Sequence, residues 1–404
     1  MHLGPLLRAL MRNLTGALLI AAQIAFTLAV CINAYVMIEE RLNLAARASG
    51  IVEDELFHLT TTVYGDGLTG LPMITEDLAA IRETPGVVDA VQMNAIPLSG
   101  SGWSMGLQTE PGADADGTGV AVYMVDQHGI STLGVELIAG RDFREEEVRI
   151  RRPGDVTWPD NAILTRSAVE TLFPDDPVAD VAGRNVFINN DHPMKIVGII
   201  DKLQAPWSGS QLVERSILVP ERMDFGSSHI LVRAQAAERD RLIPVVEDVL
   251  AARGAERLVR NVRSMTETRQ RSYQIDVGLT RVLQIVMIAL LVITALGILG
   301  LTSFNVRRRT KQIGTRRALG ATRGDVVAHF LAENMLIAAI GVVLGVLLAV
   351  AFNLWLVEAL GFPKIAWTHV AVGALALFVL SQIATLAPAY RASSISPAVA
   401  TRTV

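Results

Sequence analysis

The chain has 404 residues, of which 51% are hydrophobic and only 19% are charged, and its mean hydropathy is +0.39. That average is too apolar for an ordinary soluble enzyme. The 36 basic and 40 acidic residues give a formal net charge of -4, and no nucleic-acid partner is expected. The chain has one cysteine, Cys31, so a disulfide within it is excluded.

Four stretches of the chain contain no Asp, Glu, Lys or Arg, and they cover residues 13–38, 282–306, 334–357 and 365–390. A helix needs about 20 apolar residues to cross roughly 30 Å of hydrocarbon, so each stretch is long enough to span a membrane. Core helices of soluble proteins are rarely so long, which disfavours a large soluble helical protein. The sequence therefore predicts a membrane protein with four transmembrane helices over these residues.

The distribution of Lys and Arg predicts the orientation of these helices. Segment 307–333, between the second and third helices, holds seven basic residues against two acidic ones, and short basic loops favour the cytoplasm. The N-terminal segment 1–12 and the tail 391–404 are then also cytoplasmic, and the turn 358–364 lies outside. Segment 39–281 lies outside as well; it holds 24 basic and 37 acidic residues, which leaves +9 on the rest of the chain.

Segment 39–281 is long enough for a core of its own, and its patterns indicate an α+β extracytoplasmic domain between the first and second transmembrane helices. Helical periodicity over 39–59 and 264–281 predicts stalk helices that extend the two membrane helices outward. Thr75 is the predicted N-cap of a short helix. The run 99–119, rich in Gly, Ser, Asp and Pro, is predicted to be a mobile loop.

The rest of this domain is expected to alternate between short strands and a helix. Residues 189–191 form a predicted hairpin turn, and 236–253 is predicted to be helical despite Pro244. The runs rich in β-branched residues predict strands at 120–125, 162–164, 185–188, 194–200, 216–219 and 229–232.

The cytoplasmic segment 307–333 is the most informative part of the sequence. Gly320 is a predicted helix stop, and Thr322 with Asp325 resembles a capping box that starts the next helix. The arginines 307–309 are explained most simply by contact with lipid headgroups. Small residues interleaved with arginines after them suit close contact with a protein partner. The candidate contact residues are Ile313, Gly314, Arg316, Arg317, Ala318, Leu319, Gly320 and Ala321.

Two glycines on the third span are candidates for close helix contact. Gly341 and Gly345 form a GxxxG pattern, which permits two helix backbones to approach closely. The pattern is compatible with helix packing inside the chain and with a dimer contact.

Four segments resemble the FtsX/MacB-like permeases of ABC systems. The run 312–349, QIGTRRALGATRGDVVAHFLAENMLIAAIGVVLGVLLA, is similar to the C-terminal domain of that family, and 388–400 resembles its terminal signature. The runs 134–147 and 162–188 are similar to the family's periplasmic core domain. Gln312 departs from the Glu of many relatives. The resemblance implies a bacterial inner-membrane protein in which 313–321 is the coupling helix that docks on an ABC ATPase.

ATP hydrolysis needs a phosphate-binding loop that this chain lacks. None of its four lysines follows a glycine, so there is no Walker A motif and the chain is not expected to be an enzyme. No cofactor is expected to bind directly, and ATP and Mg would be used by the partner ATPase. The histidines do not have metal-ligand spacing, and no catalytic or metal-binding residues are predicted.

The resemblance implies the membrane (permease) subunit of an ABC complex, which transmits ATP-driven motion to its outer domain. Expected partners are the ATPase, a second permease copy or a related permease, membrane lipid, and for MacB-like efflux a periplasmic adaptor and an outer-membrane channel. Lipoprotein release as in LolC/LolE-like proteins and FtsX-like regulation of a cell-wall hydrolase are alternatives. A membrane sensor or scaffold without transport is the alternative from another class.

Overall fold

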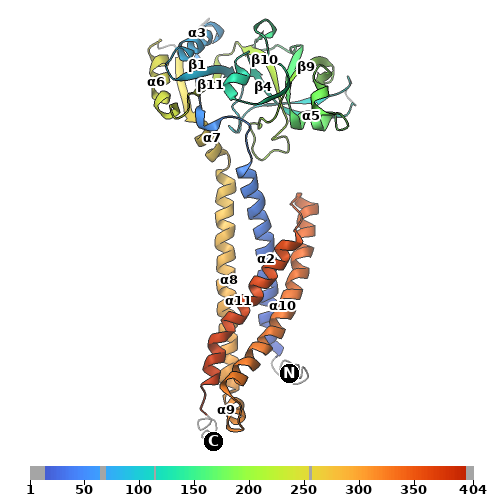
Figure 1. Cartoon of the computed structure of the whole chain (residues 1–404), viewed down its shortest axis with the longest axis vertical. Helices are drawn as coiled ribbons and strands as arrows, with labels where there is room; N and C mark the ends of the chain where they lie inside the picture. The colour runs from blue at the N-terminus through green and yellow to red at the C-terminus, as the bar shows by residue number, and fades with distance from the viewer. Residues whose placement is uncertain (1–13, 64–69, 113–114, 254–256, 397–404) are drawn as a thin grey trace. The chain divides into compact units, whose positions relative to one another are not determined.

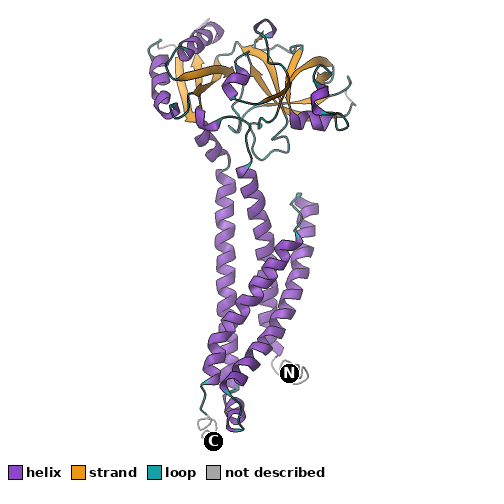
Figure 2. Ribbon diagram, in the orientation of Figure 1, coloured by secondary structure: helices purple, strands orange, loops and turns teal. Residues whose placement is uncertain are grey.

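The computed structural model describes residues 14–63, 70–112, 115–253 and 257–396 (Figure 1). The chain divides into two compact units. One, here the helical unit, comprises Met1–Ala45 with Asp276–Val404; the other, here the β-rich unit, comprises Ala46–Ile275. Figure 2 shows this division directly, because every described strand lies in the second unit. The predicted fold class, membrane helices with a large α+β domain between the first and second, is confirmed.

In the described residues of the helical unit, four helices are long and apolar enough to cross a membrane. Each predicted span lies almost wholly within one of them, and the helices continue past the charge-free stretches. The N-terminal segment 1–12 and Asn13 lie outside the described residues. The four helices are α2 (Leu14–Ala46), α8 (Gln274–Arg308), α10 (Arg323–Leu360) and α11 (Trp367–Ser393), and a short helix, α9 (Thr310–Ala318), lies between α8 and α10.

Polar side chains within these helices bond to neighbouring helices. Thr27 and Thr294 share a hydrogen bond of 2.7 Å between α2 and α8, and Asn33 donates to the carbonyl of Ala349 on α10. Asn334 on α10 donates to the carbonyl of Ser381 on α11 at 3.1 Å. These bonds satisfy polar groups that would otherwise be unpaired in hydrocarbon, so the helices pack in a defined register.

A four-stranded antiparallel sheet forms one half of the β-rich unit. Its strand order is β12 (Arg257–Ser264), β1 (Leu56–Val63), β11 (Ser227–Ala234), β2 (Val87–Met93). Helices α3 (Gly70–Arg82) and α6 (Arg239–Ala251) cover one face, where Phe57 and Leu59 lie in their core. The order of strands and helices is that of a split β-α-β unit.

The other half is inserted between β2 and β11. Pairing of β4 with β10 closes six strands into a ring, β4, β3, β8, β9, β7, β10, with β6 and β5 attached to it. The strand bounds are β3 (Trp103–Gln108), β4 (Gly117–Val125), β5 (Leu137–Gly140), β6 (Arg149–Arg151), β7 (Asn161–Thr165), β8 (Asn185–Ile188), β9 (His192–Ile200) and β10 (Ser216–Met223). Two short helices, α4 (Gly129–Leu133) and α5 (Arg166–Leu172), complete this half.

A shared core joins the two halves. Leu56 and Val91 of the sheet and Tyr123 and Leu218 of the ring are fully buried in one cluster. The Tyr123 hydroxyl donates to the carbonyl of Gln204 at 2.6 Å, which satisfies its only polar group. Burial in an apolar core raises the pKa of Tyr123. Because one face of the four-stranded sheet is covered by helices and the other by this core, both faces of β1 are buried.

Four predictions for this part of the chain are wrong in part. Segment 39–59 was predicted to be helical, but the helix ends at Ala46. Residues 56–59 instead begin strand β1, whose side chains are buried on both faces of the sheet. The helix predicted from Thr75 begins at Gly70. The predicted loop 99–119 contains β3 and the start of β4, because their pairing satisfies backbone groups of the Gly-rich run. Segment 264–281 is divided by Tyr273 into α7 (Met265–Ser272) and α8.

The predicted strands and hairpin turn are confirmed. Every strand predicted over 120–232 lies within an observed strand. The hairpin joins antiparallel β8 and β9, and its turn residues Asn189 and Asn190 have φ values of 52° and 76°. Asn tolerates this left-handed region better than other non-glycine residues, which is why two asparagines form this turn.

Candidate coupling surface and the cavity of the β-rich unit

Helix α9 is held against the rest of the helical unit by a small apolar core and an ion pair. Ile313 packs with Val326 and Phe330 of α10 and with residues of α11. Just before α9, Arg309 pairs with Glu333 of α10 at 2.8 Å, and their side chains are 19% and 12% exposed. The position of α9 is therefore fixed by packing on one face.

The turn between α9 and α10 forms as predicted from its residues. Gly320 has φ of +100°, a conformation that side chains rarely adopt. The Thr322 hydroxyl accepts from the Asp325 amide at 3.2 Å, and the Thr322 amide donates to the Asp325 carboxylate at 2.9 Å. This capping box satisfies free amides at the start of α10, so the turn is well defined.

Arg317 anchors the end of another helix. Its guanidinium donates from Nη1 to the carbonyls of Ser393 and Ile395, at 2.9 and 2.8 Å. Carbonyls at the C-terminus of a helix have no partner within the helix, and a cation there also interacts favourably with the helix dipole. Arg317 therefore joins α9 to the end of α11.

The predicted contact residues divide into an interior set and a surface set. Ile313 and Gly314 are buried within the helical unit, and Arg317 is half-buried at α11. Leu319 is 84% exposed, which is unusual for a leucine in a well-ordered turn. The residues open to a partner, here the coupling surface, are Arg316, Ala318, Leu319 and Gly320, with Ala321 half-buried beside them.

Gly341 and Gly345 lie against α2. A Cβ at Gly341 would come within 2.9 Å of the Ala21 carbonyl, and one at Gly345 within 3.0 Å of the Ala25 Cα. The two glycines therefore allow close approach of α10 and α2 within the chain.

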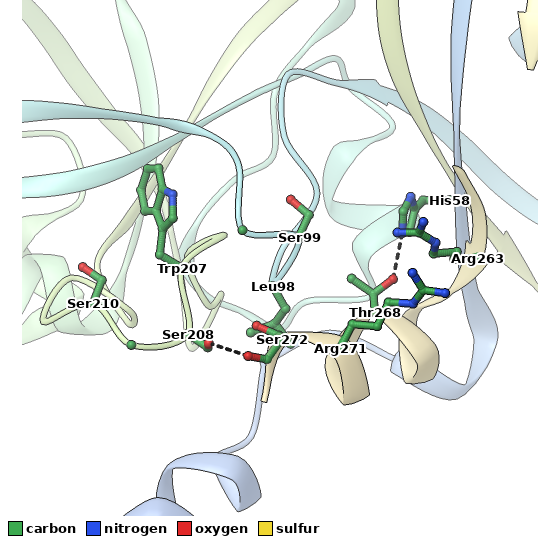
Figure 3. Close-up of a pocket in the computed structure, with 12 residues that line it drawn as sticks. His58, Leu98, Ser99, Trp207, Ser208, Ser210, Arg263, Thr268, Arg271 and Ser272 are labelled. Atoms are coloured by element: carbon green, nitrogen blue, oxygen red, sulfur yellow. Dashed lines mark hydrogen bonds between the residues drawn. The ribbon is translucent and has the colours of Figure 1, made fainter. Parts of the chain in front are cut away.

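The β-rich unit contains a cavity of about 540 Å³ that the sequence analysis did not find (Figure 3). His58 and Arg263 are direct partners across β1 and β12, on the sheet face opposite Phe57 and Leu59. Thr268 and Arg271 reach the cavity from α7, three residues apart and so on one face of that helix. Loops 98–100 and 207–210 complete its lining.

The chemistry of the cavity is polar and cationic. His58 Nε2 and Thr268 Oγ1 share a hydrogen bond of 2.8 Å. Burial, with the nearby His229 and Arg263, lowers the pKa of His58 from 6.5 to about 4, so its ring is neutral at neutral pH. Within the described residues, no group of three or more His, Cys, Asp or Glu side chains could hold a metal ion.

Comparison with known proteins connects both units to one family. The model of the MacB-like periplasmic core domain matches residues 24–251, more than half of the chain, and that of the FtsX-like permease C-terminal domain matches residues 284–397. The chain belongs to the MacB-like permease family. Both matched domains are of permease type, and neither is an ATPase domain.

The curated relatives are longer proteins. The macrolide export ATP-binding/permease protein MacB of Campylobacter jejuni (strain 81-176) is 25% identical over 303 residues, which cover 70% of this chain and 43% of that protein. MacB of Marinobacter nauticus is 28% identical over 212 residues, covering 50% of this chain and 32% of that protein. The chain thus spans less than half the length of these relatives.

The similarity to solved structures is partial, as two examples show. The periplasmic region of MacB from Actinobacillus actinomycetemcomitans is 14% identical, with a TM-score of 0.32, and covers 55% of this chain and 94% of that structure. The extracellular domain of the ABC-type transporter YknZ is 12% identical, with a TM-score of 0.32, and covers 50% of this chain and 100% of that structure.

Proposed function

We propose that the chain is the permease subunit of an ABC transporter complex in a bacterial inner membrane and that a separate ATPase binds its coupling surface. Membership of the MacB-like permease family supports this proposal. The name of the curated relatives, ATP-binding/permease protein, supports it as well. The chain has no Walker A motif, so ATP and Mg are used by the partner.

The observation on which the proposal rests is the exposed Leu319 beside the exposed Arg316. Arginine is enriched among the residues that dominate binding at protein interfaces, and the exposed leucine beside it offers apolar area that a partner could bury. The turn is rigid because Arg317, the Arg309–Glu333 pair and the capping box fix it from three sides. Motion of a bound ATPase would therefore be transmitted to α10 and α11 instead of being lost in a flexible loop.

The β-rich unit is the part that would act on substrate. In this proposal both termini are cytoplasmic, the β-rich unit is periplasmic, and two permease copies, or this chain with a related permease, form the complex. A periplasmic adaptor and an outer-membrane channel would complete a MacB-like efflux system. The membrane helices contain no Asp, Glu, Lys or Arg in their central stretches, which agrees with a substrate that is moved outside the membrane.

The test is to isolate the complex from the native host in mild detergent and to identify co-purifying chains by mass spectrometry. We expect an ABC ATPase, and we expect the double variant Arg316→Ala, Leu319→Ala to recover about tenfold less of it, because truncation of central contact residues costs roughly 1 to 2 kcal/mol or more. Lys311→Ala, an exposed cation on the same helix, is the matched control and should leave recovery unchanged.

The other proteins recovered distinguish functions within the family. An adaptor supports efflux, whereas a lipoprotein carrier or a cell-wall hydrolase beside the ATPase would replace efflux with one of those roles. Unchanged ATPase recovery in the double variant would contradict the coupling surface. Failure to recover any ATPase after crosslinking would contradict the transport proposal itself and favour a sensor or scaffold.

A further inference from the structure

The cavity of the β-rich unit contains a cation without a protein counter-charge. Arg263 makes one long hydrogen bond, 3.5 Å to the Asn261 side chain, and no carboxylate of the described residues lies within ion-pair distance of it. Arg271 pairs with Glu267 at 2.8 Å, and both side chains are about half exposed. The two arginines and Glu267 together leave one net positive charge facing the cavity.

Polar groups around this charge are arranged for a ligand. His58 is 5% exposed, and its Nδ1 atom is buried without a hydrogen-bond partner in the described part of the chain. Leaving a buried polar atom without a hydrogen-bond partner is unfavourable, so such atoms are rare unless something else satisfies them. The hydroxyls of Ser99, Ser210 and Ser272 lie along the same cavity.

The opposite side of the cavity is aromatic. Figure 3 shows Trp207 and Ser210 on the left and His58 with Arg263 on the right. Trp207 packs against the shared core, and its indole N–H has no hydrogen-bond partner among the described residues. An aromatic ring facing a cationic end favours a ligand with an apolar body and one anionic group.

The loops that close the cavity are fixed and strained. The amides of Leu98 and Gly100 donate to the carbonyls of Ala205 and Pro206, at 3.3 and 2.9 Å, so loop 98–100 is joined to the chain that leads into Trp207. Leu98 has φ of 63°, a conformation that is costly for a leucine. Strained residues persist where the surroundings fix them, and they are concentrated at ligand sites.

From these observations we propose that this cavity binds an organic anion with an apolar body. Arg263 and Arg271 hold the anionic group, a phosphate or carboxylate, while Trp207 contacts the body and the Ser272 hydroxyl donates to a remaining oxygen. Charge-assisted bonds to arginine are stronger than neutral ones and favour planar or tetrahedral oxyanions. The inference does not depend on the proposed transport function, because it concerns binding in the absence of an ATPase.

The test is calorimetric titration of the full chain in phosphatidylcholine nanodiscs with 1-naphthyl phosphate. We expect saturable binding, whereas the neutral 1-naphthol should bind at least about tenfold more weakly, since it lacks the charge-assisted bonds. Arg263→Gln should weaken binding of 1-naphthyl phosphate by about tenfold or more. Arg260→Gln is the matched control: Arg260 is exposed on the same strand, outside the cavity, and its loss should change binding less than about twofold because solvent screens it.

A second pair of variants tests the aromatic contact. Trp207→Ala should weaken the binding of 1-naphthyl phosphate but leave the weaker binding of inorganic phosphate nearly unchanged. Trp103 is an exposed tryptophan outside the cavity, and Trp103→Ala should change the binding of neither compound. Circular dichroism of each variant establishes that the unit remains folded.

The source of the anion is distinguished by competition. Displacement of 1-naphthyl phosphate by lysophosphatidylglycerol, but not by inorganic phosphate, assigns the site to a lipid headgroup, and the reverse assigns it to a soluble phosphate; either result supports an anion site. Equal binding of 1-naphthol and 1-naphthyl phosphate, or equal losses in Arg263→Gln and Arg260→Gln, would overturn the proposal.

Discussion

At the scale of single residues, His58 is deeply buried and lies close to His229 and Arg263. It faces Arg263 across the sheet and bonds to Thr268 of α7. Because a charged imidazole is disfavoured by burial first, and then by His229 and Arg263, the folded protein keeps this ring neutral. The same residue therefore influences both the cavity and the response of the β-rich unit to acid.

This position predicts how stability changes with pH. The pKa of His58 is about 4 in the folded state against an ordinary value of 6.5, so the unfolded chain binds a proton at higher pH. The free energy of unfolding is therefore unaffected by this group above pH 6.5. As the pH falls towards 4, protonation of His58 in the unfolded chain lowers it by a total on the order of 3 kcal/mol. In His58→Gln, which cannot titrate, the thermal midpoint of the full chain should fall less between pH 7 and pH 4.5.

The control for this experiment is His192→Gln, since His192 begins β9 beside the hairpin turn, away from the cavity. It should retain the acid sensitivity of the unsubstituted protein. His229, whose pKa is also lowered by burial, remains in both variants and contributes equally to each. Identical pH profiles for His58→Gln and the unsubstituted chain would show that His58 is not the group responsible.

At the scale of elements, the contact between α10 and α2 depends on two residues without side chains. At Gly345 an added Cβ would lie 2.9 Å from the Leu28 Cβ and 3.0 Å from the Ala25 backbone, and neither can move without displacing α2. By contrast, nothing lies within 4 Å of a Cβ added at Gly300 on α8. The two positions are therefore a matched pair for testing helix packing.

We expect Gly345→Ala and Gly300→Ala to have opposite effects. Overpacking at Gly345 should cost about 1 to 3 kcal/mol, whereas alanine at Gly300 should be neutral or stabilise the helix by up to about 1 kcal/mol. Thermal unfolding in detergent, followed by loss of monodisperse protein on gel filtration, measures both. A midpoint for Gly345→Ala equal to or above that of Gly300→Ala would be inconsistent with close packing of α10 on α2.

The elements that could be predicted from the sequence are those set by local patterns. The charge-free stretches predicted the four long helices. The turns were predicted from Asn189, Gly320 and the Thr322–Asp325 pair. Both kinds of element depend only on residues that are close in the sequence. Strand β1 was missed because both of its faces are buried, which removes the alternation of polar and apolar residues that identifies a strand.

The cavity could not be predicted for a related reason. Its lining comes from β1, β12, α7 and two loops that are distant in sequence, and the pairing of His58 with Arg263 depends on a register shift between His58 and Thr60. The coupling surface was predicted only as a segment. The sequence did not predict that Ile313 is buried and Leu319 is exposed, because this difference depends on how α9 packs against α10 and α11.

At the scale of the whole molecule, the distribution of charge predicts which side of the membrane each unit faces. Segment 39–281 has 37 acidic and 24 basic residues, while the remainder of the chain has a net charge of +9, concentrated around α9. Basic residues in short loops remain in the cytoplasm during insertion, whereas a long domain is translocated largely regardless of its charge. Two strongly exposed residues, Val156 of the β-rich unit and Leu319 of the coupling surface, are suitable reporters, at 82% and 84% exposed.

Labelling of single cysteines in intact cells tests this orientation. In a Cys31→Ser background, which removes the only native thiol, Val156→Cys should react with a membrane-impermeant maleimide once the outer membrane is permeabilised. Leu319→Cys should react only after the inner membrane is also opened, because the basic segment that contains it is predicted to face the cytoplasm. Both cysteines should react in detergent, which controls for burial. If Leu319→Cys were labelled before Val156→Cys, the orientation would be inverted, and an ATPase in the cytoplasm could not reach α9.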